Sequence, residues 1–126
     1  MRRLAAPFAA LLLAAGCGDD DDEAPGRTVT VDAGATVAVT AREYSFDPDR
    51  IVVEAAGPLT IELENAGDLA HNLRLRGDGE DAGGTPTFPG GRTESARVRL
   101  EPGTYELVCT VGDHAELGMM GELEVK

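Results

Sequence analysis

The chain has 126 residues, which is enough for one small domain and little more. Its 23 acidic residues outnumber its 11 Lys and Arg residues, so the formal net charge is −12 at pH 7. This balance argues against a nucleic-acid partner, because such partners are bound by clustered Lys and Arg.

The first 16 residues have the layout of a bacterial secretory signal peptide. Arg2 and Arg3 form a short basic start, residues 4–13 are almost entirely apolar, and residues 14–16 are small. The apolar run is too short to span a bilayer as a stable helix. We therefore predict that residues 1–16 are a signal peptide and that the protein is exported.

Cys17 follows these small residues directly, and its position resembles the lipobox of bacterial lipoproteins. The resemblance implies that Cys17 carries lipid, although Ala14 stands where that motif more often has Leu. An ordinary cleaved signal is the alternative. The five consecutive acidic residues that follow, within residues 18–26, repel one another and bury nothing. We predict that residues 17–27 are a lipidated cysteine and a disordered tether, which would anchor the protein to the outer face of the cell membrane or in the periplasm.

Residues 28–126 form the predicted domain, and apolar and polar residues alternate repeatedly along it. Such alternation is typical of half-buried β-strands. Strands are predicted, in chain order, over residues 28–31, 36–41, 51–53, 60–64, 69–76, 96–100, 105–109 and 119–125. Residues 77–91 are rich in Gly, Asp and Pro and predict a long surface loop. Seven or eight short strands at roughly ten-residue spacing indicate an all-β, antiparallel β-sandwich.

The two histidines of the chain both occupy positions that suit a metal site. His114 follows Cys109 with four residues between them, and Met119 follows His114 after the same gap. His71 lies upstream, on a separate predicted strand. Copper that cycles between Cu(I) and Cu(II) is well served by one thiolate, two imidazoles and a weak axial thioether. The sequence therefore predicts a mononuclear copper site made of these four residues.

The phase of the predicted strands gives an independent check on these ligands. Cys109 and His71 each share a strand face with apolar residues, so both should point into the sandwich, as should Leu69 on the face of His71. Met119 is in phase with the apolar residues of the last strand, whereas Met120 is in phase with its charged residues. We therefore choose Met119 as the ligand and expect Met120 to be exposed near the rim of the site.

Several alternatives stay open for these residues. Taken singly, each would be an ordinary core residue. Export favours disulfides, so a bond between Cys17 and Cys109 is possible; if Cys17 is acylated, metal binding gives the unpaired Cys109 a reason to persist. Zinc suits the set less well than copper, because zinc sites seldom use thioether sulfur. Two histidines are too few for a multicopper oxidase or a nitrite reductase, so we expect no enzyme.

Residues 103–125 resemble the C-terminal copper loop of the cupredoxins, the family of type 1 (blue) copper proteins. The Cys-x4-His-x4-Met spacing is closer to the sulfocyanin and rusticyanin branch than to plastocyanin, whose Cys–His gap is shorter. Residues 70–73 resemble the upstream ligand strand of the family, and residues 44–51 resemble its N-terminal half. The family often has Pro-Gly before the second histidine, where this chain has Val, Gly and Asp at residues 111–113, and this departure affects the expected reduction potential more than the metal.

The resemblance implies a Greek-key sandwich with one type 1 copper ion and one-electron transfer. It also implies that Asn72 braces the cysteine loop by hydrogen bonds near Thr110, which would hold the ligands still. In the family, electrons pass through the exposed edge of the second histidine, here His114. Leu117, Met120 and Ala115 are candidates for the apolar patch around that edge.

The expected function is to carry single electrons between redox partners at the outer face of a membrane. A cytochrome, an oxidase or a reductase is the expected type of partner, and we expect a monomer. The alternative is a copper-delivery lipoprotein that hands its metal to another protein. Five acidic and three basic residues precede residue 28, so the domain itself carries a net charge of −10. That charge has two interpretations, steering of a basic partner and simple solubility.

Overall fold

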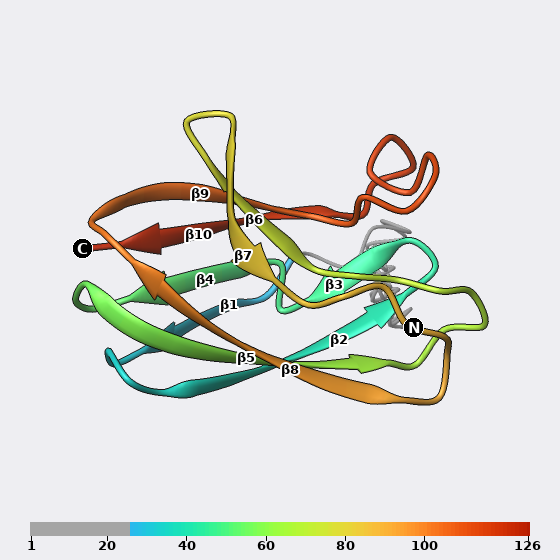
Figure 1. The fold of residues 1–126 in the computed structure, drawn as a ribbon, viewed down its shortest axis with the longest axis horizontal. Coiled ribbons are helices and arrows are strands. Elements are labelled where there is room, and N and C mark those ends of the chain that lie inside the picture. The colour runs from blue at the N-terminus through green and yellow to red at the C-terminus, as the bar shows by residue number, and fades with distance from the viewer. Residues whose placement is uncertain (1–25) are drawn as a thin grey trace, which may run out of the picture.

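The computed structural model describes residues 26–126, which form two facing β-sheets (Figure 1). The strands are, in chain order, β1 (Thr28–Val31), β2 (Thr36–Arg42), β3 (Ser45–Asp47), β4 (Arg50–Val53), β5 (Gly57–Asn65), β6 (Arg74–Gly77), β7 (Glu80–Gly84), β8 (Thr93–Leu100), β9 (Gly103–Val108) and β10 (Met120–Val125). No helix forms in this part of the chain, and hence none that could cross a membrane. The predicted all-β sandwich is confirmed. The predicted signal peptide, the lipid on Cys17 and residues 17–25 of the predicted tether lie outside the described residues. Arg27, expected in the tether, instead pairs with Asp47 of β3 at 2.9 Å.

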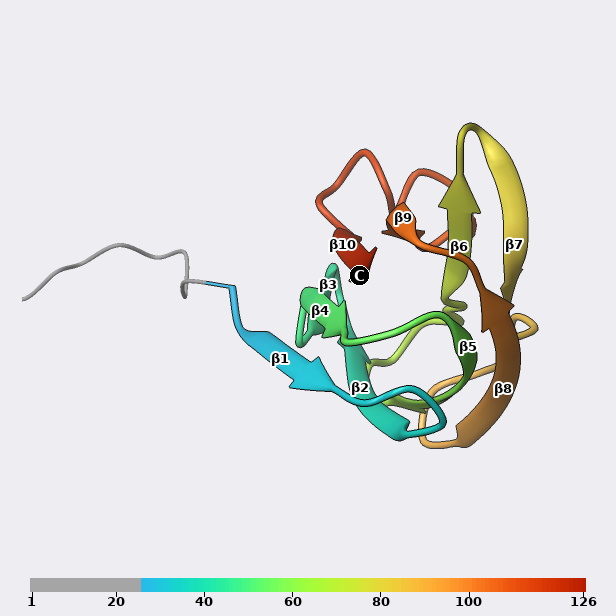
Figure 2. The ribbon, with the colours of Figure 1, turned by 90° about the vertical axis from the view of Figure 1, so that its left-hand side faces the viewer.

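Six strands form one sheet, in the order β1-β4-β10-β9-β6-β7, and four form the other, in the order β3-β2-β5-β8. The chain passes repeatedly from one sheet to the other, as in a Greek-key sandwich, and the β6–β7 hairpin projects from one side (Figure 2). The structure has ten strands rather than seven or eight. Three pairings are parallel, β1 with β4, β4 with β10 and β2 with β5, so the sheets are mixed rather than wholly antiparallel.

Among the differences between the predicted and observed elements, the two largest lie between residues 69 and 91. The predicted surface loop 77–91 contains β7, which pairs antiparallel with β6. The Gly-rich composition of residues 77–91 is typical of a loop, so the sequence did not predict this strand. Gly84 has a φ of 147°, and a side chain there would collide with the carbonyl oxygen of Leu73, so only glycine fits this pairing. The predicted strand 69–76 begins only at Arg74, and Leu69, expected inside, is 43% exposed.

The alternating apolar residues of both sheets point inward and form one core. Its largest fully buried side chains include Ile51, Leu59, Ile61, Leu63, Leu73, Leu75, Leu107 and Leu123. His71, Cys109 and Met119 are also fully buried and adjoin this core. Three connections meet at the end of the sandwich where β9 gives way to β10: the β9–β10 loop, the β2–β3 turn and the β5–β6 connection (Figure 1). The side chains that the sequence singled out lie at this end.

Candidate metal centre

Three donor atoms from distant parts of the chain converge at this end of the sandwich. The Nδ1 atoms of His71 and His114 are 3.2 Å apart, and Cys109 Sγ lies 3.9 Å from the first and 3.6 Å from the second. All three residues are buried, and their donor atoms lie within 4.8 Å of one another. A single ion about 2.0–2.3 Å from each atom spans separations of this size. The structure thus brings together three of the four residues that the sequence singled out as ligands.

Met119, the fourth, lies beside this group through its backbone. Its N–H donates to the carbonyl oxygen of His114 at 3.1 Å, and its own carbonyl accepts from the N–H of Cys109 at 3.2 Å. The Met119 side chain is fully buried, whereas Met120 is 43% exposed. The burial predicted from strand phase is therefore confirmed for both methionines.

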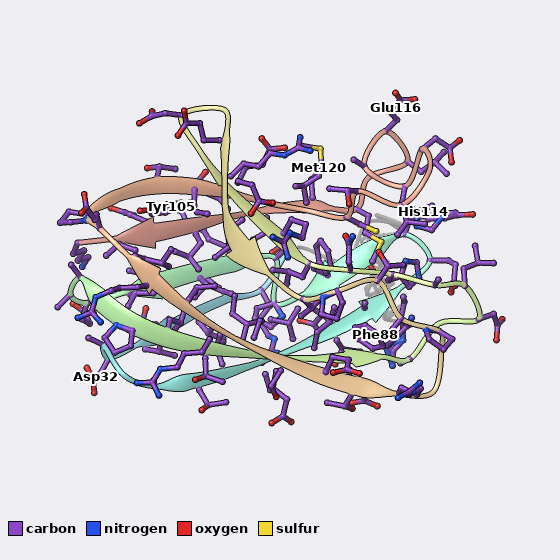
Figure 3. All side chains as sticks on the ribbon, in the orientation of Figure 1. Asp32, Phe88, Tyr105, His114, Glu116 and Met120 are labelled. Carbon is purple, nitrogen blue, oxygen red and sulfur yellow. The ribbon has the colours of Figure 1, made fainter. Side chains whose placement is uncertain are left out.

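The β9–β10 loop is a series of tight turns that brings the chain at Met119 back beside Cys109. The His114 N–H donates to the Val111 carbonyl, and the Gly118 N–H donates to the Ala115 carbonyl, both at 3.1 Å. Gly118 has a φ of 112°, a conformation that residues with a side chain rarely adopt. Figure 3 shows this loop, with Glu116 at its tip and His114 facing the body of the sandwich. The turns allow Cys109, His114 and Met119 to sit close together although they are separated in sequence.

Asn72 joins the β5–β6 connection to the β9–β10 loop, called the ligand loop below because it carries Cys109, His114 and Met119. Its Oδ1 accepts from the Thr110 N–H at 2.9 Å, and its Nδ2 donates to the Thr110 hydroxyl at 2.7 Å. A third hydrogen bond runs from the same Nδ2 to the Thr87 hydroxyl at 3.0 Å. Asn72 is only 5% exposed, so these bonds satisfy an amide that would otherwise be costly to bury. They fix the residues that directly follow His71 and Cys109 relative to each other.

The β2–β3 turn contacts both histidines from another side, and no sequence pattern predicted these contacts. The Tyr44 ring lies 5.0 Å from that of His114 between centroids, tilted by 56°. Glu43 Oε1 lies 3.3 Å from His71 Nε2, a long hydrogen bond. This turn is 28 residues before His71 in sequence, and no motif in it indicates a role at the site.

Burial and the Glu43 carboxylate act in opposite directions on His71. Desolvation lowers the pKa of His71, because burial disfavours its charged form, and the hydrogen bond and charge of Glu43 oppose that shift. The pKa of Glu43 itself lies below its usual value, chiefly because the Leu69 N–H donates to its carboxylate. Both directions favour a neutral His71 beside an ionised Glu43, which is the state in which an imidazole binds metal.

The donor set fits one copper ion. Two imidazole nitrogens and one thiol sulfur face one another in a buried space, and the backbone of the buried Met119 is hydrogen-bonded to two of these three residues. Two nitrogen atoms 3.2 Å apart cannot both carry a proton toward the other, whereas a shared cation uses both lone pairs. Cys109 forms no disulfide within residues 26–126, so its sulfur is available to bind a metal. Soft sulfur combined with imidazole is the ligand chemistry that copper prefers.

Solved structures of blue copper proteins share this fold. Dithionite-reduced auracyanin from Roseiflexus castenholzii is 20% identical, with a TM-score of 0.68 over 75% of this chain and 98% of its own. Auracyanin A from Chloroflexus aurantiacus, described as a "blue" copper protein, is 23% identical, with a TM-score of 0.63 over 78% of this chain and 100% of its own. Rusticyanin from Thiobacillus ferrooxidans is 22% identical, with a TM-score of 0.58 over 82% and 85%.

The family is identified from the sequence rather than from the fold. No curated protein matches this sequence significantly. The profile of the cupredoxin-like domain, however, matches residues 6–121, which is most of the chain. Together with the two-sheet fold and the converging His, Cys and His donors, this match shows that the chain belongs to the cupredoxin-like domain family.

Proposed function

We propose that this protein carries single electrons on one copper ion bound by His71, Cys109, His114 and axial Met119. The observation that carries the proposal is the convergence of two Nδ1 atoms and one Sγ within 3.9 Å of one another in a buried space. When bound, copper would supply the one-electron couple between Cu(I) and Cu(II). One thiolate, two imidazoles and a weak thioether accommodate both oxidation states.

The surroundings of the donors favour electron transfer over catalysis or metal release. His71, Cys109 and Met119 are 0% exposed, so a substrate has no direct approach to their donor atoms. The hydrogen bonds between Asn72 and Thr110 and between His71 and Glu43 hold the ligand-bearing segments in place. A site whose ligands are held in this way changes little between oxidation states, and a small change favours rapid electron exchange.

His114 offers the path for electrons to the surface. It is 8% exposed and is the only one of the four proposed ligands that reaches solvent. The large apolar side chains that are exposed within residues 26–126 are Leu69 at 43%, Leu117 at 51% and Met120 at 43%. Each is within three residues of a proposed ligand. Exposed apolar side chains this close to the ligands in sequence suit the small, transient contacts of electron-transfer partners.

We also propose that the protein acts outside the cytoplasm, anchored by lipid on Cys17 at the outer face of a membrane or in the periplasm. The support is the order of basic, apolar and small residues before Cys17 and the acidic run after it. A monomer that meets a cytochrome, oxidase or reductase is consistent with the single exposed ligand edge. The net charge of −10 over residues 28–126 would favour a basic partner surface.

Repeated redox cycling of the copper-loaded protein tests this function against copper delivery. We expect an intense visible thiolate-to-copper band that bleaches with dithionite and returns with ferricyanide over many cycles. Copper content should stay constant when a Cu(I) chelator is present during the reduced phase, because the ligands are buried. Stoichiometric loss of copper to the chelator on reduction would instead support delivery, and absence of the band would contradict the site itself.

Replacement of each methionine by Leu distinguishes the axial ligand from its neighbour. Met119→Leu removes a sulfur donor that stabilises Cu(II), so the equilibrium constant for reduction should rise by about tenfold, or about 59 mV. Met120→Leu preserves an exposed apolar side chain and should change the constant by less than about twofold. Potentiometric titration of the visible band measures both. A larger effect at Met120 than at Met119 would show that the ligand assignment is wrong.

A further inference from the structure

The two ring nitrogens of His71 face different surroundings. Nδ1 lies 3.2 Å from His114 Nδ1 and 3.9 Å from Cys109 Sγ, so it faces the proposed metal position. Nε2 faces the other way and lies 3.3 Å from Glu43 Oε1. The His71 side chain is fully buried, so the Glu43 carboxylate is the acceptor available to the proton that Nε2 must carry when Nδ1 binds a metal.

The Glu43 carboxylate is itself held in place. Its Oε1 accepts from the backbone N–H of Asp68 at 2.8 Å and of Leu69 at 2.7 Å, in addition to His71. Gly67 lies directly against the same carboxylate, and a Cβ at that position would collide with it. The Glu43 side chain is only 27% exposed. The loop that leads into His71 thus wraps around this carboxylate and fixes its position.

A fixed carboxylate behind a ligand histidine has two consequences. It selects the tautomer with the proton on Nε2, which leaves the Nδ1 lone pair free for the metal. It also places a negative charge one imidazole ring away from the ion, where it stabilises Cu(II) more than Cu(I). These effects are electronic, and they differ from the structural effect of holding the backbone of Asp68 and Leu69.

We infer that Glu43 is a positioning residue for the copper site: its carboxylate orients His71, fixes the Nε2–H tautomer and lowers the reduction potential. The inference rests on the proposed function, because it requires copper on His71 Nδ1. It adds a residue from the β2–β3 turn, which lies outside the β9–β10 loop and outside the β5–β6 connection that carries His71.

Substitution of Glu43 by Gln tests the electronic effect. Gln preserves the size and an oxygen acceptor but removes the charge, so the equilibrium constant for reduction of the copper-loaded protein should rise by about tenfold, or about 59 mV. The affinity for Cu(II) should fall by about tenfold. The control is Glu62→Gln, the same loss of charge on the exposed face of β5, which should change either quantity by less than about twofold.

An NMR measurement on wild-type protein loaded with diamagnetic Cu(I) tests the tautomer without any variant. The His71 Nε2–H should give a downfield signal that exchanges slowly with water, because it is buried and bonded to a carboxylate. An unprotonated or rapidly exchanging Nε2 would overturn the inference. So would a reduction potential of Glu43→Gln equal to that of Glu62→Gln, since a purely structural role would lower the unfolding temperature without moving the potential. Absence of the visible copper band from copper-loaded wild-type protein would contradict the proposed function itself, before the role of Glu43 is tested.

Discussion

Replacing Cys109 with Ser should abolish the visible copper band completely. The band requires a thiolate bound to Cu(II), and a serine hydroxyl neither ionises near neutral pH nor supplies a soft donor. Cys109 is fully buried within 3.9 Å of both histidine Nδ1 atoms, so no other described residue can replace its sulfur. We expect Cu(II) affinity to fall by at least about a hundredfold. Absorption spectra and copper content after dialysis measure the two effects.

The fold should survive this substitution, so that loss of colour reports on the site. Ser is close in size to Cys, and burying its hydroxyl in place of the thiol costs about 1–3 kcal/mol. Denaturant unfolding of the metal-free variant checks that cost. The matched control is Cys17→Ser, the same chemical change at the other cysteine, which should leave the absorbance per copper ion unchanged. A visible thiolate band that persists in Cys109→Ser would refute the proposed ligand set.

Asn72→Ala should destabilise the metal-free protein by about 2–4 kcal/mol. The substitution removes three hydrogen bonds and leaves the Thr110 N–H without its partner, and each such loss at a buried position costs about 1 kcal/mol or more. It should also broaden the visible band of the copper-loaded protein, because Cys109 and His71 would no longer be held at a fixed separation. Chemical denaturation and absorption spectroscopy measure these changes.

Thr110→Ala provides the graded comparison for Asn72. This variant loses only the hydroxyl that accepts from Asn72 and retains the bond from the Thr110 N–H to Asn72 Oδ1. Its cost should be about 1 kcal/mol, because Thr110 is exposed and water can reach the freed amide. If Asn72→Ala costs no more than Thr110→Ala, the bracing role assigned to the asparagine is wrong.

Local patterns predicted the parts of the fold that depend on which way a side chain points. Alternation along the last strand distinguished buried Met119 from exposed Met120, and it placed Cys109 and His71 inside. Pairing partners are a different matter, because they depend on residues far away in sequence. The parallel pairing of β4 with β10 joins Arg50 to Glu122 and has no local signature. The same holds for β7, whose glycines conceal a strand that exists because β6 pairs with it.

The same distinction explains what could be predicted of the site. Spacing within one loop indicated Cys109 and His114, because a loop between adjacent strands is a local feature. Donor chemistry indicated His71, the other histidine of the chain. Glu43 could not be predicted, because its role arises only when the β2–β3 turn meets a loop 25 residues later. Leu69 was expected inside because the alternation was extended too far. Its backbone carbonyl instead accepts from the buried Asn65 amide, in a loop where the strand pattern no longer applies.

The hydrogen bond from the Cys109 N–H to the Met119 carbonyl closes the ligand loop at its base. The residues between these two ends form a loop at one end of the sandwich; Val111 of this loop packs against the core, which is otherwise built mainly by the strands. Exposed loop residues such as Asp113 and Glu116 can therefore be exchanged without repacking the sheets beneath them. Substitutions at these exposed positions would alter the surroundings of the proposed metal while the scaffold of strands keeps its packing.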